Sequence, residues 1–120
     1  MMFAAHGAMA ACMNKYIAQR DGSKYTLTIL TGKISYAEAY ELAQTASKSP
    51  ALLPEWVDEK GKMITRALDM KVIRPMPVAC DDKPMGVVIS TTFLVARPLN
   101  GKIYLKFDDK NTVALEQQER

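Results

Sequence analysis

The sequence predicts an α+β fold: an antiparallel sheet with a C-terminal hairpin, and two main helices packed on it. Helical spacing covers residues 2–19, a helix-start signal precedes residues 36–47, and alternating strand patterns fill the C-terminal third. Helices followed by a run of strands are typical of this fold class. The 120 residues suit a single domain over 1–120, which is long enough to bury a core without disulfides.

The first expected helix covers residues 2–19. Its apolar side chains recur at spacings of three, four and seven residues, and its alanines favour a helix. Gly22 is a natural stop, after which residues 25–30 alternate apolar side chains with threonine and indicate a strand. The helix is rich in methionine and apolar on more than one face. We therefore take it as a candidate interface, formed by Met2, Phe3, Met9, Met13 and Ile17.

The second expected helix has the clearest local signal. Ser35 and Glu38 have the spacing of a capping box, in which each side chain bonds the other residue's backbone N–H. Ile34 precedes the cap and can pack on the first turn. An apolar stripe then follows, so the helix is expected over 36–47 and ends before Pro50.

Residues 51–70 allow two interpretations. Ile64, Ala67 and Leu68 suit a short helix over 62–70, which we favour. Alternatively, residues 58–61 form a turn with Gly61 in the left-handed region, and Trp56 and Val57 face Met63 and Ile64 as short strands. The choice between helix and hairpin for residues 54–60 stays open.

The remaining residues have strand patterns. Residues 72–78 carry Pro75 and Pro77, so this stretch can only be an edge strand or a polyproline-like segment. Residues 86–96 and 102–108 are expected to pair as a hairpin through 98–101, with an odd-numbered loop and Asn100 or Gly101 in the left-handed region. A turn is expected at 81–84, and a short frayed helix over 112–120.

No motif indicates catalysis. His6 is the only histidine and has no metal-ligand spacing beside it. Cys12 and Cys80 are interpreted as buried reduced thiols, and Asp81 and Asp82 as turn residues. We expect no catalytic residue, no metal and no cofactor. The chain lacks the apolar run of about 18 residues that a membrane span needs, and its first residues lack an early Lys or Arg, so we expect a cytoplasmic protein.

Two functions remain. The first is a non-enzymatic protein-interaction or self-association module that uses the first helix and Trp56, a residue type common at interfaces. The alternative is a winged-helix-like nucleic-acid binder, with residues 36–47 and 62–70 as its helices and the C-terminal hairpin as its wing. The nucleic-acid contacts would be Lys62, Arg66, Arg97 and Lys102. A net charge of +3, spread over the chain, is weak electrostatic support for this alternative, so the interaction module ranks first.

Overall fold

The computed structural model describes residues 13–77 and 85–118, and its main element is one eight-stranded sheet. The strand order is β4-β3-β7-β8-β1-β2-β6-β5. The strands are β1 (Asn14–Asp21), β2 (Lys24–Thr31), β3 (Glu55–Val57), β4 (Met63–Arg66), β5 (Asp69–Met76), β6 (Gly86–Leu94), β7 (Ile103–Asp108) and β8 (Asn111–Gln117). The helix α2 (Tyr36–Lys48) and the 3-10 turn η1 (Pro50–Leu52) connect β2 to β3.

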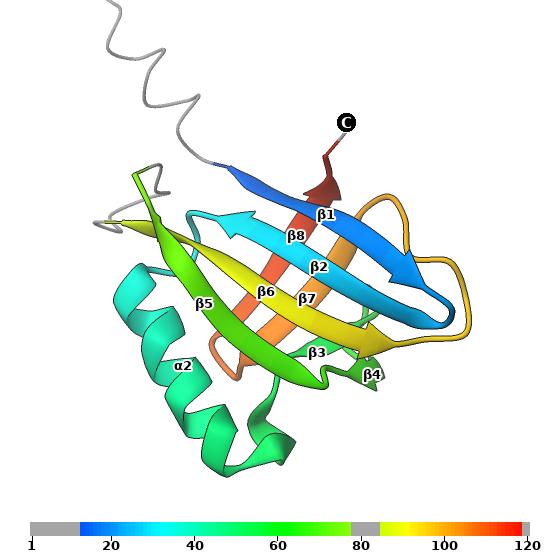
Figure 1. Ribbon diagram of the computed structural model, residues 1–120, viewed down its shortest axis with the longest axis horizontal. Helices are drawn as coiled ribbons and strands as arrows, with labels where there is room; N and C mark the ends of the chain where they lie inside the picture. Colours follow the sequence, from blue (N-terminus) through cyan, green and yellow to red (C-terminus); the bar gives the residue numbers. More distant parts are fainter. Residues whose placement is uncertain (1–12, 78–84, 119–120) are drawn as a thin grey trace, which may run out of the picture.

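The sheet folds back over itself into two layers. Figure 1 shows β1, β2, β6 and β5 in the front layer and β8, β7, β3 and β4 behind them. On one side the layers join through β1 and β8, which are parallel and pair Lys15 with Glu116. On the other side the chain runs from β4, paired with β3, almost directly into β5, paired with β6. The inner faces of both layers therefore enclose one core.

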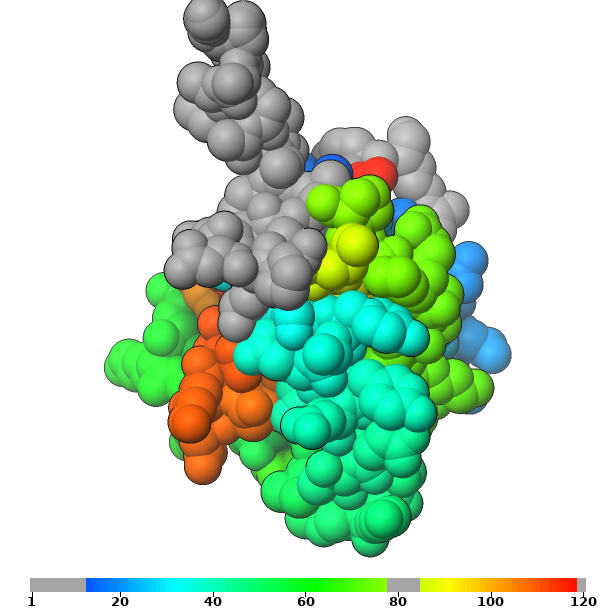
Figure 2. All heavy atoms as spheres, turned by 90° about the vertical axis from the view of Figure 1, so that its left-hand side faces the viewer, coloured from blue at the N-terminus to red at the C-terminus, as the bar shows by residue number. Residues whose placement is uncertain are grey.

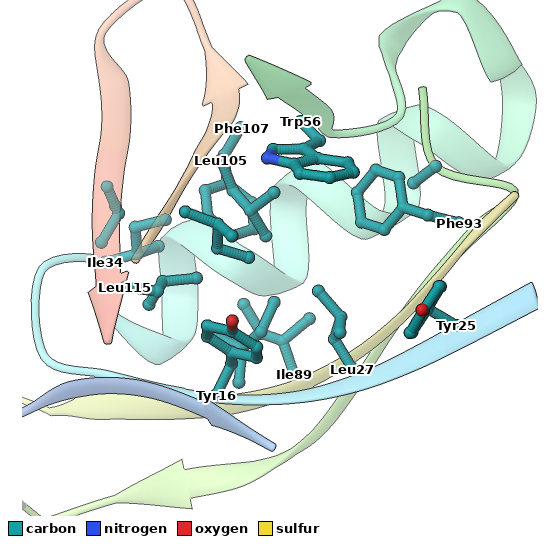
Figure 3. Close-up of a cluster of buried hydrophobic side chains, with 14 of the residues drawn as sticks. Tyr16, Tyr25, Leu27, Ile34, Trp56, Ile89, Phe93, Leu105, Phe107 and Leu115 are labelled. Atoms are coloured by element: carbon teal, nitrogen blue, oxygen red, sulfur yellow. The ribbon is translucent and has the colours of Figure 1, made fainter. Parts of the chain in front are cut away.

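The core consists of inward-facing side chains from both layers, which point toward one another in Figure 3. Strand alternation explains its composition, since every second residue of a strand faces the same way. In β7, Ile103, Leu105 and Phe107 are buried, whereas the residues between them are partly exposed. The largest fully buried side chains include Tyr16, Leu27, Ile34, Ile89, Phe93, Leu105 and Leu115.

The predicted second helix is confirmed as α2, and its capping box is formed. The Ser35 hydroxyl accepts a hydrogen bond from the Glu38 backbone N–H at 3.0 Å, and the Ser35 N–H donates to a Glu38 carboxylate oxygen at 2.9 Å. Ile34, just before the cap, is fully buried. Figure 2 shows α2 beside β5, with the β7–β8 turn on its other flank.

The predicted fold class is wrong in two respects. The described residues contain one α-helix rather than two, and the sheet is mixed because β1 and β8 are parallel. Residues 14–19, expected in the first helix, lie in β1, where Tyr16 faces the core and Ile17 faces outward, opposite Thr28. Tertiary pairing overrides the helical spacing of this segment. Residues 2–12 of the predicted helix lie outside the described residues.

The helix favoured over 62–70 is also wrong, and the alternative hairpin is correct. Residues 63–66 form β4, which pairs with β3 and places Trp56 opposite Thr65. Turn chemistry explains this outcome. A carboxylate oxygen of Asp58 accepts hydrogen bonds from the backbone N–H groups of Lys60 and Lys62, and Gly61 has a φ of 87°, a conformation that favours glycine.

The predicted C-terminal hairpin does not form. β6 pairs with β2 and β5, whereas β7 pairs with β3 and β8. Because β6 and β7 do not pair with each other, the prediction of an odd-numbered hairpin loop between them is also wrong. Phe93 and Leu105 still share the core, and Gly101 is left-handed with a φ of 67°. The two strands lie in different layers because the segment between them crosses from one layer to the other.

The short helix predicted over 112–120 is wrong as well. Residues 111–117 form β8, in which Val113 and Leu115 face the core. Their two-residue spacing is a strand pattern. In contrast, β5 lies at the sheet edge, as Pro75 requires. The turn predicted at 81–84 lies outside the described residues.

Replacing the helix cap should weaken the fold measurably. Ser35→Ala removes an acceptor from the first turn of α2, and we expect the free energy of unfolding to fall by about 1 kcal/mol. Urea denaturation followed by circular dichroism measures this change. Ser47→Ala, at an exposed position of the same helix, is the matched control and should change stability by less than about 0.5 kcal/mol. Equal stability of the two variants would contradict the capping role.

Candidate functional site

A groove of about 410 Å³ lies between the β3–β4 hairpin and the segment that leads into β7. It combines aromatic, aliphatic and charged side chains, and we call it the Trp56 groove. Its lining residues are Trp56, Val57, Asp58, Glu59, Lys60, Ile64, Arg97, Lys102, Ile103 and Tyr104.

The segment between β6 and β7 presents Arg97 to this groove and is anchored near its start and in its middle. At its start, the backbone N–H of Val95 donates to the carbonyl oxygen of Ser23 at 2.9 Å. In its middle, Leu99 is buried in the core. Arg97 lies between these anchors and is exposed. The core therefore limits how far the Arg97 backbone can move.

The end of the same segment is held by Tyr16. The Tyr16 hydroxyl donates to the carbonyl oxygen of Gly101 at 2.6 Å, and the N–H of Gly101 donates to the Gln117 side chain at 3.0 Å. Burial, together with a smaller contribution from the nearby Glu116 carboxylate, raises the pKa of Tyr16 to about 12. The hydroxyl therefore keeps its proton and remains a donor throughout the neutral range.

Two cations of the groove lie over aromatic rings. The Arg97 guanidinium carbon is 5.2 Å from the centre of the Trp56 ring, and the Lys102 ammonium is 5.7 Å from the centre of the Tyr104 ring. Both distances fall in the range of cation–π attraction. Among the described residues, neither cation has a carboxylate partner within 4 Å.

The β3–β4 turn lies on the other side of the groove and contributes its two carboxylates, Asp58 and Glu59. Asp58 is committed to the β3–β4 turn, because one of its carboxylate oxygens accepts two backbone N–H groups. Glu59 and Lys60, at the tip of the turn, are both exposed. The groove thus has a rigid turn on one side and the anchored Arg97 segment on the other.

The structure brings together three residues that the sequence had assigned to different sites. Trp56 was a candidate interface residue, whereas Arg97 and Lys102 were candidate nucleic-acid contacts, and all three line the Trp56 groove. Sequence reasoning missed Tyr104 and Ile64. The spacing of Lys102 and Tyr104 could have indicated their shared strand face, since residues two apart on a strand point the same way.

The other candidate residues do not join the groove. Lys62 is exposed on the β3–β4 turn without lining the groove, and Arg66 forms an ion pair with Glu55 at 2.5 Å. Met13 precedes β1, and Ile17 lies on the outer face of that strand; both are partly buried. Met2, Phe3 and Met9 lie outside the described residues.

A second cleft, of about 510 Å³, lies between α2, η1 and the β7–β8 turn. Several carboxylates line it, but most already have internal partners. Glu38 belongs to the capping box, Glu55 pairs with Arg66, and Asp108 accepts hydrogen bonds from Asn111. In residues 13–77 and 85–118, no group of three His, Cys, Asp or Glu side chains could hold a metal ion. Most carboxylates of this cleft therefore stabilise the helix cap, a strand pair or a turn.

Comparisons with protein-family models, with curated proteins and with solved structures give no match. Within the described part of the chain, no helix is long and apolar enough to cross a membrane. The geometry of the Trp56 groove is therefore the basis for a functional proposal.

Removing the Arg97 side chain should uncover the only tryptophan of the chain. Trp56 is 7% exposed, and Arg97 lies over its ring. We expect Arg97→Ala to increase quenching of tryptophan fluorescence by acrylamide and to lower the free energy of unfolding by about 0.5–1 kcal/mol. Lys110→Ala, on the distant β7–β8 turn, should leave quenching unchanged. Unchanged quenching in both variants would contradict this contact.

Stability should depend on the Tyr16 proton at high pH. The pKa of Tyr16 is raised to about 12 from 10.0, so the unfolded chain releases this proton more easily than the folded chain. The stabilisation is complete below pH 10, and the free energy of unfolding should fall as the pH rises from 10 to 12. Tyr16→Phe should remove this part of the pH dependence and, through the lost hydrogen bond, cost about 1 kcal/mol at pH 7. Parallel urea titrations from pH 8 to 12 test this, and identical slopes in both proteins would contradict it.

Proposed function

We propose that the chain is a non-enzymatic protein-interaction module that binds a segment of a partner protein in the Trp56 groove. The observation that carries this proposal is the convergence of Trp56, Arg97 and Tyr104 in one groove. Tryptophan, tyrosine and arginine are the residue types most enriched among the residues that dominate protein interfaces. Arg97 and Tyr104 present surface to a partner, whereas Trp56 is almost fully covered and holds the Arg97 guanidinium over its ring.

The floor of the groove also suits a protein partner. Ile64 and Tyr104 are partly exposed in the groove and offer apolar contact area, whereas Val57 and Ile103 are already buried. Apolar side chains surrounded by charged ones are the usual arrangement of an interface, with a dry centre and a polar rim. Arg97 and Lys102 supply rim charges without an internal carboxylate partner among the described residues.

Nucleic acid is the alternative ligand, and three observations weigh against it. Arg66 has its charge paired with Glu55. Trp56 is almost fully covered, so it offers no free ring face for a stacked base, which single-strand binding requires. The helix 62–70 and the C-terminal hairpin, on which the winged-helix interpretation depended, are absent from the described fold.

Peptide display tests the proposal directly. A random nine-residue peptide library is selected on the whole chain and on its Arg97→Glu variant, which changes an exposed loop residue and should preserve the fold. We expect enriched peptides to bind the unchanged chain and to lose most of their affinity for the variant. Lys110→Glu, which makes the same charge change outside the groove, should bind these peptides like the unchanged chain.

Two measurements identify the competing outcomes. Equal peptide binding by all three proteins would refute the groove as the interaction site. Binding of mixed-sequence single-stranded DNA or RNA that falls steeply between two salt concentrations would favour the nucleic-acid alternative. Light scattering on the same samples distinguishes self-association from binding to a different partner.

A further inference from the structure

The cations of the Trp56 groove have unused hydrogen-bonding capacity. Arg97 and Lys102 contact aromatic rings, and no hydrogen bond or ion pair of either side chain to another described residue occurs. A guanidinium binds an aromatic ring through its face and a carboxylate through the N–H groups in its plane. Arg97 can therefore stay on Trp56 and still bind an acidic group.

We propose that the Trp56 groove selects an acidic partner segment, whose carboxylates bind Arg97 and Lys102 while an adjacent apolar side chain contacts Tyr104 and Ile64. This inference rests on the proposed function, and it adds the chemistry of the ligand. The ligand is an Asp- or Glu-containing peptide with neighbouring aliphatic or aromatic residues.

Two partly exposed side chains, Ile64 and Tyr104, line the same groove as the two cations. Val57 of β3 pairs with Tyr104 of β7, and Lys102 lies two residues before Tyr104, just ahead of the strand. Lys102 and Tyr104 therefore share a face and remain in contact through the ring. An apolar side chain next to a bound carboxylate would meet Tyr104 and Ile64, which are both partly exposed, and burying its apolar surface there contributes affinity.

The acidic turn limits how much negative charge the groove accepts. Asp58 and Glu59 line the groove together with Lys60, Arg97 and Lys102, so a polyanion laid along the groove would meet two like charges as well as the cations. Repulsion between like charges across an interface is a means of excluding wrong partners. One or two carboxylates on the side of Arg97 and Lys102 avoid this repulsion, whereas a continuous phosphate backbone does not.

Two matched peptide pools test this inference. Both contain seven-residue peptides with Leu, Val, Phe or Tyr at alternate positions; the remaining positions are Asp or Glu in the acidic pool and Asn or Gln in the neutral pool. Binding is followed at 50 and 300 mM salt by Trp56 fluorescence and by the NMR signal of the Trp56 indole N–H. We expect the acidic pool to bind about tenfold more tightly at low salt, the size of one charge-assisted hydrogen bond.

The preference should depend on the two cations. In Arg97→Gln combined with Lys102→Gln, both pools should bind with the same affinity, whereas Lys110→Gln should retain the full preference for the acidic pool. Thermal unfolding of each variant confirms that the fold is intact.

The remaining outcomes separate the two proposals. If both pools move the Trp56 signals equally in the unchanged chain, the selection for acid is wrong and the interaction groove stands. If neither pool moves them and mixed-sequence single-stranded DNA does, both proposals are wrong. If no ligand moves them, the selection for acid is wrong as well.

Discussion

The hydrogen bond from the Tyr16 hydroxyl to the carbonyl oxygen of Gly101 links the core to the segment that lines the Trp56 groove. Tyr16 is fully buried in β1, which pairs with β8 where the two layers of the sheet join. A buried hydroxyl without a partner would be costly, so the bond determines where the 95–102 segment ends. That segment carries Arg97, and β7 begins directly after it. Together with buried Leu99 and the hydrogen bond from Val95 to Ser23, this bond therefore holds the segment that carries both cations of the Trp56 groove.

One of the two edges of the sheet, formed by β5, is protected against pairing with another chain. β5 is an outer strand and could pair with another chain. Its register shifts between Val72 and Arg74, its end contains Pro75, and α2 packs along it. Each of these features disfavours the addition of another strand.

Cation–π contacts restrict the side chains of Arg97 and Lys102 and leave their charges without an internal partner among the described residues. Arg97 covers the only tryptophan, and Lys102 contacts Tyr104. A long cationic side chain free in solution would lose conformational entropy on binding a ligand. Contact with a ring restricts the side chain in advance, while the charge remains available to a partner. The same contact hides the ring face that a nucleic-acid base would need.

The sequence by itself determined the local structures whose signals lie within a few residues. Ser35 and Glu38 predicted α2, Pro75 and Pro77 predicted an edge strand or a polyproline-like segment, and the turn at 58–61 was available as one of two alternatives. Such predictions succeed because capping, proline geometry and turn bonds involve neighbouring groups. For the candidate site, the sequence supplied Trp56, Arg97 and Lys102 as residues of interest.

Only the tertiary structure decided how the strands pair and which side chains meet. Residues 14–19 fit a helix by spacing, yet they form β1 because pairing with β2 buries Tyr16. β6 and β7 are consecutive strands, yet they lie in different layers, and this separation brings Arg97 over Trp56 across 41 positions of sequence. Strand pairs and grooves of this kind are stabilised by contacts between distant residues. Local spacing carries no information about such contacts, so the fold alone established that Trp56, Arg97 and Lys102 belong to one site.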